Sequence, residues 1–221
     1  MSINELKTNT EHFLRNNLVT IAGGGSGAVS EPGKAYFSME TAGVSPGLRI
    51  TKLPGKKEGA NIFEAWYIPM QQIGSFTARK LPTTAEESPG IMLTSQITGC
   101  MFAVGRDGNS TTVAHIQPDQ TSHRNVMKLF PDAPKGASFN PEAVKAVSDL
   151  RQSDMRMAAR VQGLTTAVAH AGYYADKAAS VAYDRGKREA VAVVGIRDDK
   201  GQWSIYSQLS ADQKVIDVKR I

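Results

Sequence analysis

Cys100 and His115 are the two residues of this chain whose types and spacing best suit covalent catalysis. Cys100 is the only cysteine among 221 residues, and it follows Gly99 at the start of a β-prone run. Two β-prone runs flank the segment 106–110, and an Asp-Gly pair between such runs is typical of a β-hairpin. Because Cys100 and His115 each lie seven residues from the Asp107–Gly108 pair, we expect them to face each other across the hairpin.

A thiol that faces an imidazole can act as a nucleophile. The histidine accepts the thiol proton, and the resulting imidazolium lowers the thiol pKa from about 8.5. Gly99 has no Cβ, so the chain can turn tightly there and leave backbone N–H groups near the sulfur to stabilise an oxyanion. The alternative is that Cys100 is an inert packing residue, as a lone cysteine in a β-rich core usually is. A register shift of one residue would turn its side chain to the other face of the sheet.

The same segment resembles the active-site segment of the cytotoxic necrotizing factor-like glutamine deamidases. That family includes Burkholderia lethal factor and the bacterial chemotaxis receptor deamidase. Its pattern is a small hydroxyl residue, glycine and cysteine, here Thr98, Gly99 and Cys100, with a histidine on the next strand, here His115. In two of its members a threonine also stands six residues before the cysteine, and Thr94 occupies that position in this chain.

The resemblance is closest to Burkholderia lethal factor and extends weakly over the chain from Ile62 onward. Residues 65–69 resemble the strand that precedes the active site of that protein, and residues 190–195 with 203–207 resemble its C-terminal hairpin. The turn between the cysteine and the histidine is longer than in that protein and nearer to that of the necrotizing factors. Residues 1–60 match no segment of the family. These departures affect the predicted substrate more than the predicted chemistry.

The resemblance implies a protein-glutamine glutaminase, a hydrolase that converts a specific glutamine of a host protein to glutamate. In that mechanism the Cys100 thiolate attacks the carboxamide, and His115 protonates the leaving ammonia and then activates the water that hydrolyses the thioester. Thr94 holds the imidazole in the required tautomer. Thr98 and Gly99 shape the oxyanion site. Neither a cofactor nor a metal is implied.

Two other functions fit the same residues. A thioester can be resolved by an amine as well as by water, so a transglutaminase or a protease on the same scaffold is the first alternative. The mass of the modified substrate separates deamidation from cleavage and from a larger adduct. The second alternative is a non-catalytic interaction protein in which Cys100 is buried, and the reactivity of the thiol toward alkylation tests it.

The resemblance also suggests a partner and a place of action. It implies a secreted virulence toxin that acts in the host cytosol on a translation initiation helicase, with inhibition of translation, or on a Rho-type GTPase. The first residues show no basic segment followed by an apolar run, so we predict no Sec signal peptide. The net charge is +5, but the basic residues are scattered, so we expect no nucleic-acid partner. No apolar run approaches the roughly 20 residues that span a membrane. We expect a monomer.

The composition favours a folded chain with a core of its own. Hydrophobic residues make up 41% of the chain and charged residues 21%, which is too apolar for a disordered protein. A chain of 221 residues is long enough for one catalytic domain over residues 1–221. A single cysteine excludes an internal disulfide.

Strand patterns dominate the elements that must position these residues. Helices are predicted over residues 3–16 and from Asp119 and Asn140, while residues 155–170 are ambiguous and favour a strand in their first part. Strands are predicted over residues 18–22, 35–39, 48–53, 63–69, 75–81, 91–97, 100–104, 111–116, 189–197, 202–209 and 215–218. The sequence therefore predicts an α+β fold of the deamidase-toxin type, with a sandwich-like core of antiparallel or mixed sheet and flanking helices. Residues 1–60 are predicted to form a helix and strands whose position in this fold the sequence does not assign.

Overall fold

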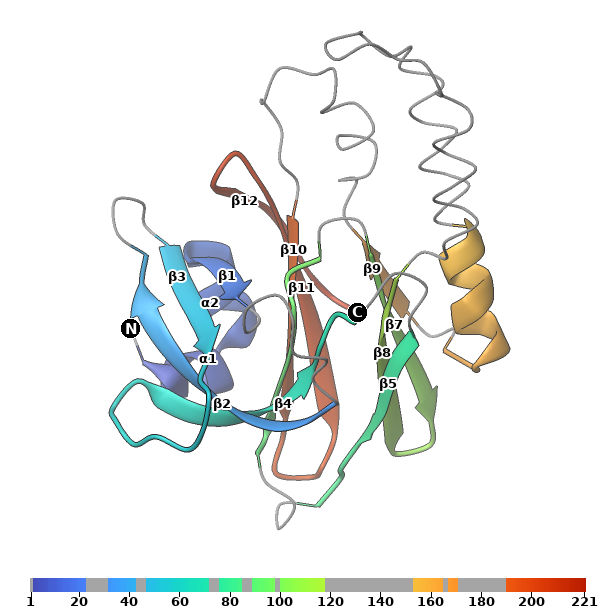
Figure 1. Cartoon of the computed structure of the whole chain (residues 1–221), viewed down its shortest axis with the longest axis horizontal. Coiled ribbons are helices and arrows are strands. Elements are labelled where there is room, and N and C mark those ends of the chain that lie inside the picture. The colour runs from blue at the N-terminus through green and yellow to red at the C-terminus, as the bar shows by residue number, and fades with distance from the viewer. Residues whose placement is uncertain are drawn as a thin grey trace, which may run out of the picture.

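The two β-sheets of this protein carry most of its ordered elements (Figure 1). The computed structural model describes residues 2–22, 32–42, 47–71, 76–84, 89–97, 100–117, 153–164, 167–170 and 190–221. The helices predicted from Asp119 and Asn140 lie outside these ranges.

Within the described ranges, the larger sheet has eight strands and the smaller has four. The strand orders are β1-β3-β2-β4-β6-β10-β11-β12 and β5-β8-β7-β9. The strands of the larger sheet are β1 (Leu18–Ala22), β2 (Gly33–Thr41), β3 (Gly47–Lys52), β4 (Ile62–Ile68), β6 (Ile91–Thr94), β10 (Ala190–Arg197), β11 (Trp203–Ala211) and β12 (Lys214–Arg220). The strands of the smaller sheet are β5 (Phe76–Leu81), β7 (Met101–Asp107), β8 (Ser110–Ile116) and β9 (Ala167–His170).

The larger sheet is mixed, whereas the described pairs of the smaller sheet are all antiparallel. Strands β1 and β3 run parallel, as do β4 and β6, and the other pairs of the larger sheet are antiparallel. Helices occupy few of the described residues, namely α1 (Ile3–Thr8), α2 (Thr10–Asn16) and residues 153–161. The prediction of an α+β fold with a mixed sheet is therefore confirmed in its coarse form.

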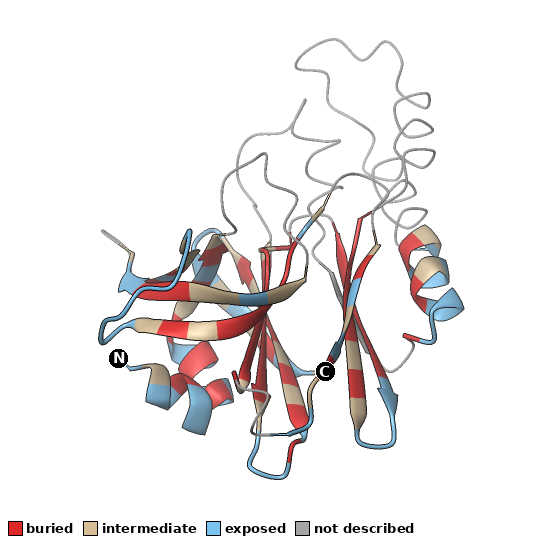
Figure 2. Cartoon of the chain, turned by 60° about the horizontal axis from the view of Figure 1, so that its bottom comes forward, coloured by how far each residue is buried: buried red, intermediate tan, exposed pale blue. Residues whose placement is uncertain are grey.

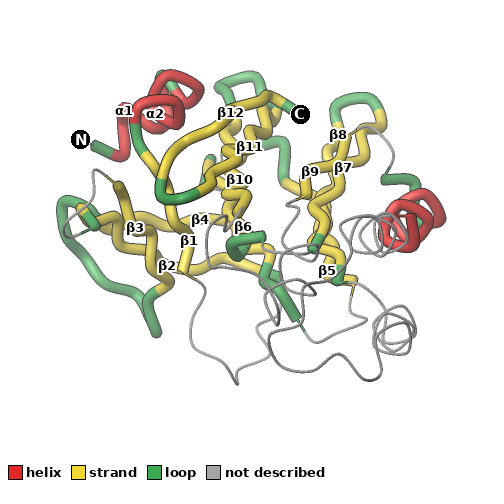
Figure 3. The backbone as a smooth tube through the Cα atoms, turned by 90° about the horizontal axis from the view of Figure 1, so that it is seen from above, coloured by secondary structure: helices red, strands yellow, loops and turns green. Residues whose placement is uncertain are grey.

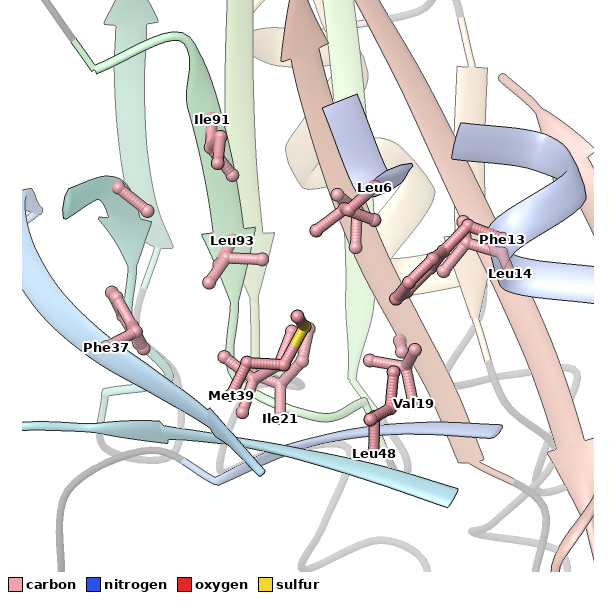
Figure 4. Close-up of a cluster of buried hydrophobic side chains, with 14 of the residues drawn as sticks. Leu6, Phe13, Leu14, Val19, Ile21, Phe37, Met39, Leu48, Ile91 and Leu93 are labelled. Carbon is pink, nitrogen blue, oxygen red and sulfur yellow. The ribbon is translucent and has the colours of Figure 1, made fainter. Parts of the chain in front are cut away.

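Helices α1 and α2 cover the outer face of the larger sheet. Leu6, Phe13 and Leu14 are fully buried there and pack against apolar side chains of β1, β2, β3 and β6 (Figure 4). Gln208 on β11 ties the helices to the sheet, because its side chain accepts from the N–H of Val19 at 2.8 Å and donates to backbone oxygens at the end of α2. The N-terminal segment is thus built into the larger sheet.

The two sheets face each other, and buried residues alternate along their strands (Figure 2). A second apolar cluster joins side chains of both sheets there. Strands β4, β6, β10 and β11 contribute to it from the larger sheet, and β5, β7 and β8 contribute from the smaller one. Its members are Trp66, Ile68, Leu81, Met92, Ile97, Cys100, Phe102, Val104, Val113, Val191, Val193, Trp203 and Ile205. We call this set the inter-sheet cluster.

The helix over residues 153–161 covers the other face of the smaller sheet (Figure 3). Met155, Ala159 and Leu164 are buried against apolar side chains of β7 and β8. The approach is close enough to require Gly105 on β7, because a Cβ there would lie 2.8 Å from a methyl group of Leu164 and 2.9 Å from a carbonyl oxygen. The strand favoured by the sequence for residues 155–161 is wrong, since this face of the sheet needs an apolar stripe with helical spacing.

Candidate active site

The β7–β8 hairpin carries His115 in a register two residues from the predicted one. His115 pairs with Phe102, and the two-residue turn consists of Gly108 and Asn109. Gly108 has a φ of +54°, which suits a glycine at the first position of such a turn. The prediction that Cys100 lies directly opposite His115 is therefore wrong, because it placed the turn one residue too early.

A shift of two residues keeps the predicted face, because side chains alternate along a strand with a period of two. Phe102 and Cys100, which directly precedes β7, both belong to the inter-sheet cluster. His115 faces the same side as Phe102, its cross-strand partner. Cys100 is thus the diagonal neighbour of His115, and diagonal neighbours in a sheet lie about 7–8 Å apart.

The Cys100 thiol is covered by the segment that follows β4. Cys100 is 5% exposed, and its Sγ lies 4.0 Å from Sδ of Met70, a residue that is itself 50% exposed. Ser95 fixes this segment, since its Oγ accepts the Met70 N–H at 3.0 Å and lies 2.7 Å from the Tyr67 hydroxyl. Met70 and its support were not identified from the sequence.

Thr94 and His115, which the sequence places 21 residues apart, are in direct contact. Thr94 Oγ1 lies 2.7 Å from His115 Nδ1 and 2.7 Å from the carbonyl oxygen of Ile68. A carbonyl oxygen can only accept, so the hydroxyl donates its one proton to Ile68. Nδ1 must then carry a proton and donate it to Oγ1. This fixes the tautomer of His115, and Nε2 is left unprotonated.

The parallel pairing of β4 and β6 explains how Thr94 reaches both partners. Ile68 and Thr94 are paired residues at the ends of these two strands. Parallel strands bring their carboxyl ends to the same edge of a sheet, and Thr94 is fully buried there. His115 arrives from the facing sheet, so the contact joins the two sheets across the inter-sheet cluster.

The second ring nitrogen of His115 is buried without a partner. Nε2 has no hydrogen-bond partner among the described residues, and neither has Oγ1 of Thr77, the residue that pairs with His115 on the opposite side. Thr77 and His115 are cross-strand neighbours of each other, so their side chains face the same side of the smaller sheet. A buried polar atom without a partner costs about 1–3 kcal/mol. Two such atoms thus lie side by side on one face of the smaller sheet. Thr77 was not predicted, because its role depends on strand pairing.

Burial lowers the pKa of His115 to about 4, because the imidazolium would lose its hydration inside the protein. The ring is therefore neutral at pH 7, and its Nε2 lone pair can accept a proton. This state suits a base that takes the thiol proton during attack. It does not favour the standing imidazolium–thiolate pair that the sequence led us to expect.

The low pKa of His115 predicts a loss of stability in acid. Its native pKa of about 4 lies below the ordinary value of 6.5, so the unfolded chain binds more protons between these two pH values. We expect the contribution of His115 to the free energy of unfolding to be complete above pH 6.5 and to fall by about 3 kcal/mol by pH 4. Urea unfolding across this range measures it.

Two variants isolate the effect. His115→Gln removes this titration, so the stability difference from the wild type should shrink toward acid pH. His12→Gln, at an exposed position on α2, is the control for the replacement of a histidine by glutamine. A difference between wild type and His115→Gln that stays constant from pH 7 to pH 4 would contradict the buried, neutral histidine.

The remaining predicted residues, Thr98 and Gly99, lie outside the described residues, and so does any oxyanion site that they form. Within the described ranges, no group of three or more His, Cys, Asp or Glu side chains could hold a metal ion. None of the described helices is long and apolar enough to cross a membrane.

Comparison with known proteins adds no relative. No protein-family model matches the chain, and no curated protein matches it. The deamidase resemblance therefore rests on the sequence alone, namely the motif around Cys100 and His115 and the weaker likeness of residues 65–69, 190–195 and 203–207.

Proposed function

We propose that this protein is a protein-glutamine deamidase that works through a Cys100 thioester. The observation that carries the proposal is His115 Nε2, a buried lone pair that has no partner among the described residues and that Thr94 keeps unprotonated. Cys100 stands on the same face of the same hairpin. A nucleophile, a base and a third group that orients the base are the three members of the triads used in acyl transfer, and we propose that Cys100 and His115 come into contact when substrate binds.

The proposed reaction transfers one acyl group in two steps, and in each step one proton passes through His115 Nε2. Nε2 takes the Sγ proton as Sγ attacks the glutamine carboxamide carbon. The protonated ring gives that proton to the amide nitrogen, the C–N bond breaks, and ammonia leaves a thioester on Cys100. Nε2 then takes a proton from water as the water oxygen attacks. The C–S bond breaks, the thiol regains its proton, and glutamate remains.

The finer assignments follow the resemblance. We propose a deamidase-toxin type fold and a secreted effector that acts as a monomer in the host cytosol. Its target would be a translation initiation helicase or a Rho-type GTPase. Amine attack on the thioester would give transglutamination instead, and no feature of the described residues favours it.

Alkylation of Cys100 tests whether it is a nucleophile served by His115. With iodoacetamide at pH 7, we expect a rate that falls at least about tenfold in His115→Ala, because the thiol loses its base. Met70→Ala removes the thioether that contacts Sγ, so it should raise the alkylation rate of Cys100 when His115 is present. In the Met70→Ala chain, His115→Ala should still lower that rate. His12→Ala is the matched control and should react as the wild type does.

Equal rates with and without His115, in both the Met70 and the Met70→Ala chains, would overturn the proposal. So would the absence of any Cys100 modification in the Met70→Ala chain. Either result would favour the alternative of a non-catalytic protein with a buried cysteine.

A further inference from the structure

Trp66 forms one wall of a pocket of about 470 Å³ at the seam between the two sheets. Lys34 on β2, Trp66 on β4, and Arg79 and Lys80 on β5 all line it. Its volume lies in the range of small-ligand sites. Neither Cys100 nor His115 lines it, so the pocket is distinct from the candidate active site.

The cations of this pocket form no ion pair with a carboxylate of the described residues. The Lys34 ammonium lies 5.3 Å, and the Arg79 guanidinium 4.3 Å, from the centre of the Trp66 ring. Lys80 also lines the pocket, although its side chain alternates to the other face of β5. Within the part of the chain that the structure describes, no ion pair is recorded for these three residues, although Glu64 lies two residues from Trp66 on β4. Clustered cations without carboxylates attract an anion.

Two N–H donors of the pocket residues are buried and have no acceptor among the residues that the structure describes. They are Nε1 of Trp66, which is 6% exposed as a residue, and Nε of Arg79. The Arg79 guanidinium is held in place by the carbonyl oxygen of Pro32, which accepts from Nη1 at 3.0 Å. Buried donors normally find an acceptor, and two donors beside fixed cations match the two oxygens of a carboxylate.

The rim of the pocket is preformed. Trp203 Nε1 donates to the Pro82 carbonyl oxygen at 2.7 Å, and Arg197 donates to the carbonyl oxygens of Pro82 and Thr84. Gly201 has a φ of +81°, and a Cβ at this position would overlap the backbone of Thr83. The turn after β10 thus locks the segment after β5 in place, which reduces the entropy that a bound ligand would otherwise have to overcome.

The pocket lies two residues along β5 from the candidate active site. Arg79 and Thr77 are two residues apart on β5 and point to the same face, and Thr77 pairs with His115. Two residues along a strand span about 6.6–6.8 Å. An extended peptide with its glutamine at His115 would therefore bring a residue about two positions away to this pocket.

We propose that this pocket binds the acidic side chain of a protein substrate close to the target glutamine. The identity of the ligand as part of the substrate rests on the proposed function. Binding of an anion by Lys34, Arg79 and Trp66 does not, because it requires neither the thiol nor the imidazole.

The two tryptophans of the chain provide a direct readout. In ¹H–¹⁵N spectra of the Cys100→Ser chain, a peptide with aspartate two residues from glutamine should shift the Trp66 indole N–H, which has no acceptor in the structure. The Trp203 indole, already bonded to Pro82, should move less. The same peptide with asparagine in place of aspartate, and inorganic phosphate, are the comparison ligands.

Variants distinguish binding in this pocket from non-specific attraction of the peptide to surface cations. Lys34→Gln, at an exposed position, and Arg79→Gln should each weaken peptide binding at least about tenfold. Lys219→Gln, an exposed cation on β12 that pairs with Asp217, should leave binding unchanged. Loss of binding in both pocket variants, with the fold retained in Lys34→Gln, would support the subsite.

The subsite would be overturned if the aspartate peptide caused no shift of the Trp66 indole signal, or if the asparagine peptide bound equally well. It would also be overturned if phosphate saturated the Trp66 signal and the aspartate peptide produced no change. None of these readouts depends on ammonia release. If the peptide binds but no glutamine is converted in the wild type, the anion subsite stands and the proposed deamidation fails.

Discussion

Replacement of Cys100 by serine is expected to lower ammonia release from a glutamine substrate by at least about 10³-fold. A hydroxyl is far less acidic than a thiol, and His115, with a pKa of about 4, is too weak a base to activate it. The side chains differ by one atom, so the fold should be retained. Ammonia release and thermal unfolding of the two proteins measure the two effects.

The matched control for this variant is Met101→Leu. Met101 adjoins Cys100 but packs on the other side of the smaller sheet, against the helix over residues 153–161. This change conserves volume, so activity should stay near the wild-type level. Activity retained in Cys100→Ser, or lost equally in both variants, would argue against Cys100 as the nucleophile.

Replacement of Thr94 by valine is expected to lower kcat about 10²-fold and the free energy of unfolding by about 2–4 kcal/mol. Valine has nearly the shape of threonine but no hydroxyl. Nδ1–H of His115 and the carbonyl oxygen of Ile68 would then both be buried without a partner. The imidazole would lose the contact that fixes its tautomer, so the loss should appear in kcat more than in KM.

Thr94→Ser restores the hydroxyl and should recover most of the activity. Thr77→Val is the matched control for stability, because the Thr77 hydroxyl has no partner to lose. A Thr94→Val enzyme that is destabilised but retains its kcat would limit Thr94 to a structural role. A variant with unchanged stability would contradict the hydrogen bonds described here.

Local signals in the sequence were sufficient to predict the described strands other than β9 (Ala167–His170), and the hairpin, but not the register of that hairpin. Alternating apolar residues and the Asp107–Gly108 pair predicted β7 and β8. The turn begins one residue later because Gly108 adopts the positive φ at its first position. Alternating apolar residues wrongly indicated a strand at residues 155–161. This segment is a helix whose Met155 and Ala159 side chains lie on one stripe against the sheet.

Cys100, His115 and Thr94 could be proposed as site residues from the sequence because their spacing resembles that of a known family. The groups that contact them could not be predicted in this way. Ile68 accepts from Thr94 only because β4 and β6 pair in parallel, and Thr77 meets His115 only because β5 pairs with β8. The same holds for the anion pocket, whose residues come from both sheets. Pairings of this kind depend on the whole fold rather than on local pattern.

Mass spectrometry of host-cell lysate, treated with the wild-type protein or with Cys100→Ser, tests the deamidase proposal most directly. We expect one protein to gain glutamate in place of a specific glutamine in the wild-type sample and not in the Cys100→Ser sample. If no protein shows a glutamine-to-glutamate change, or if the change occurs equally with Cys100→Ser, then this chain is not a deamidase that acts through Cys100.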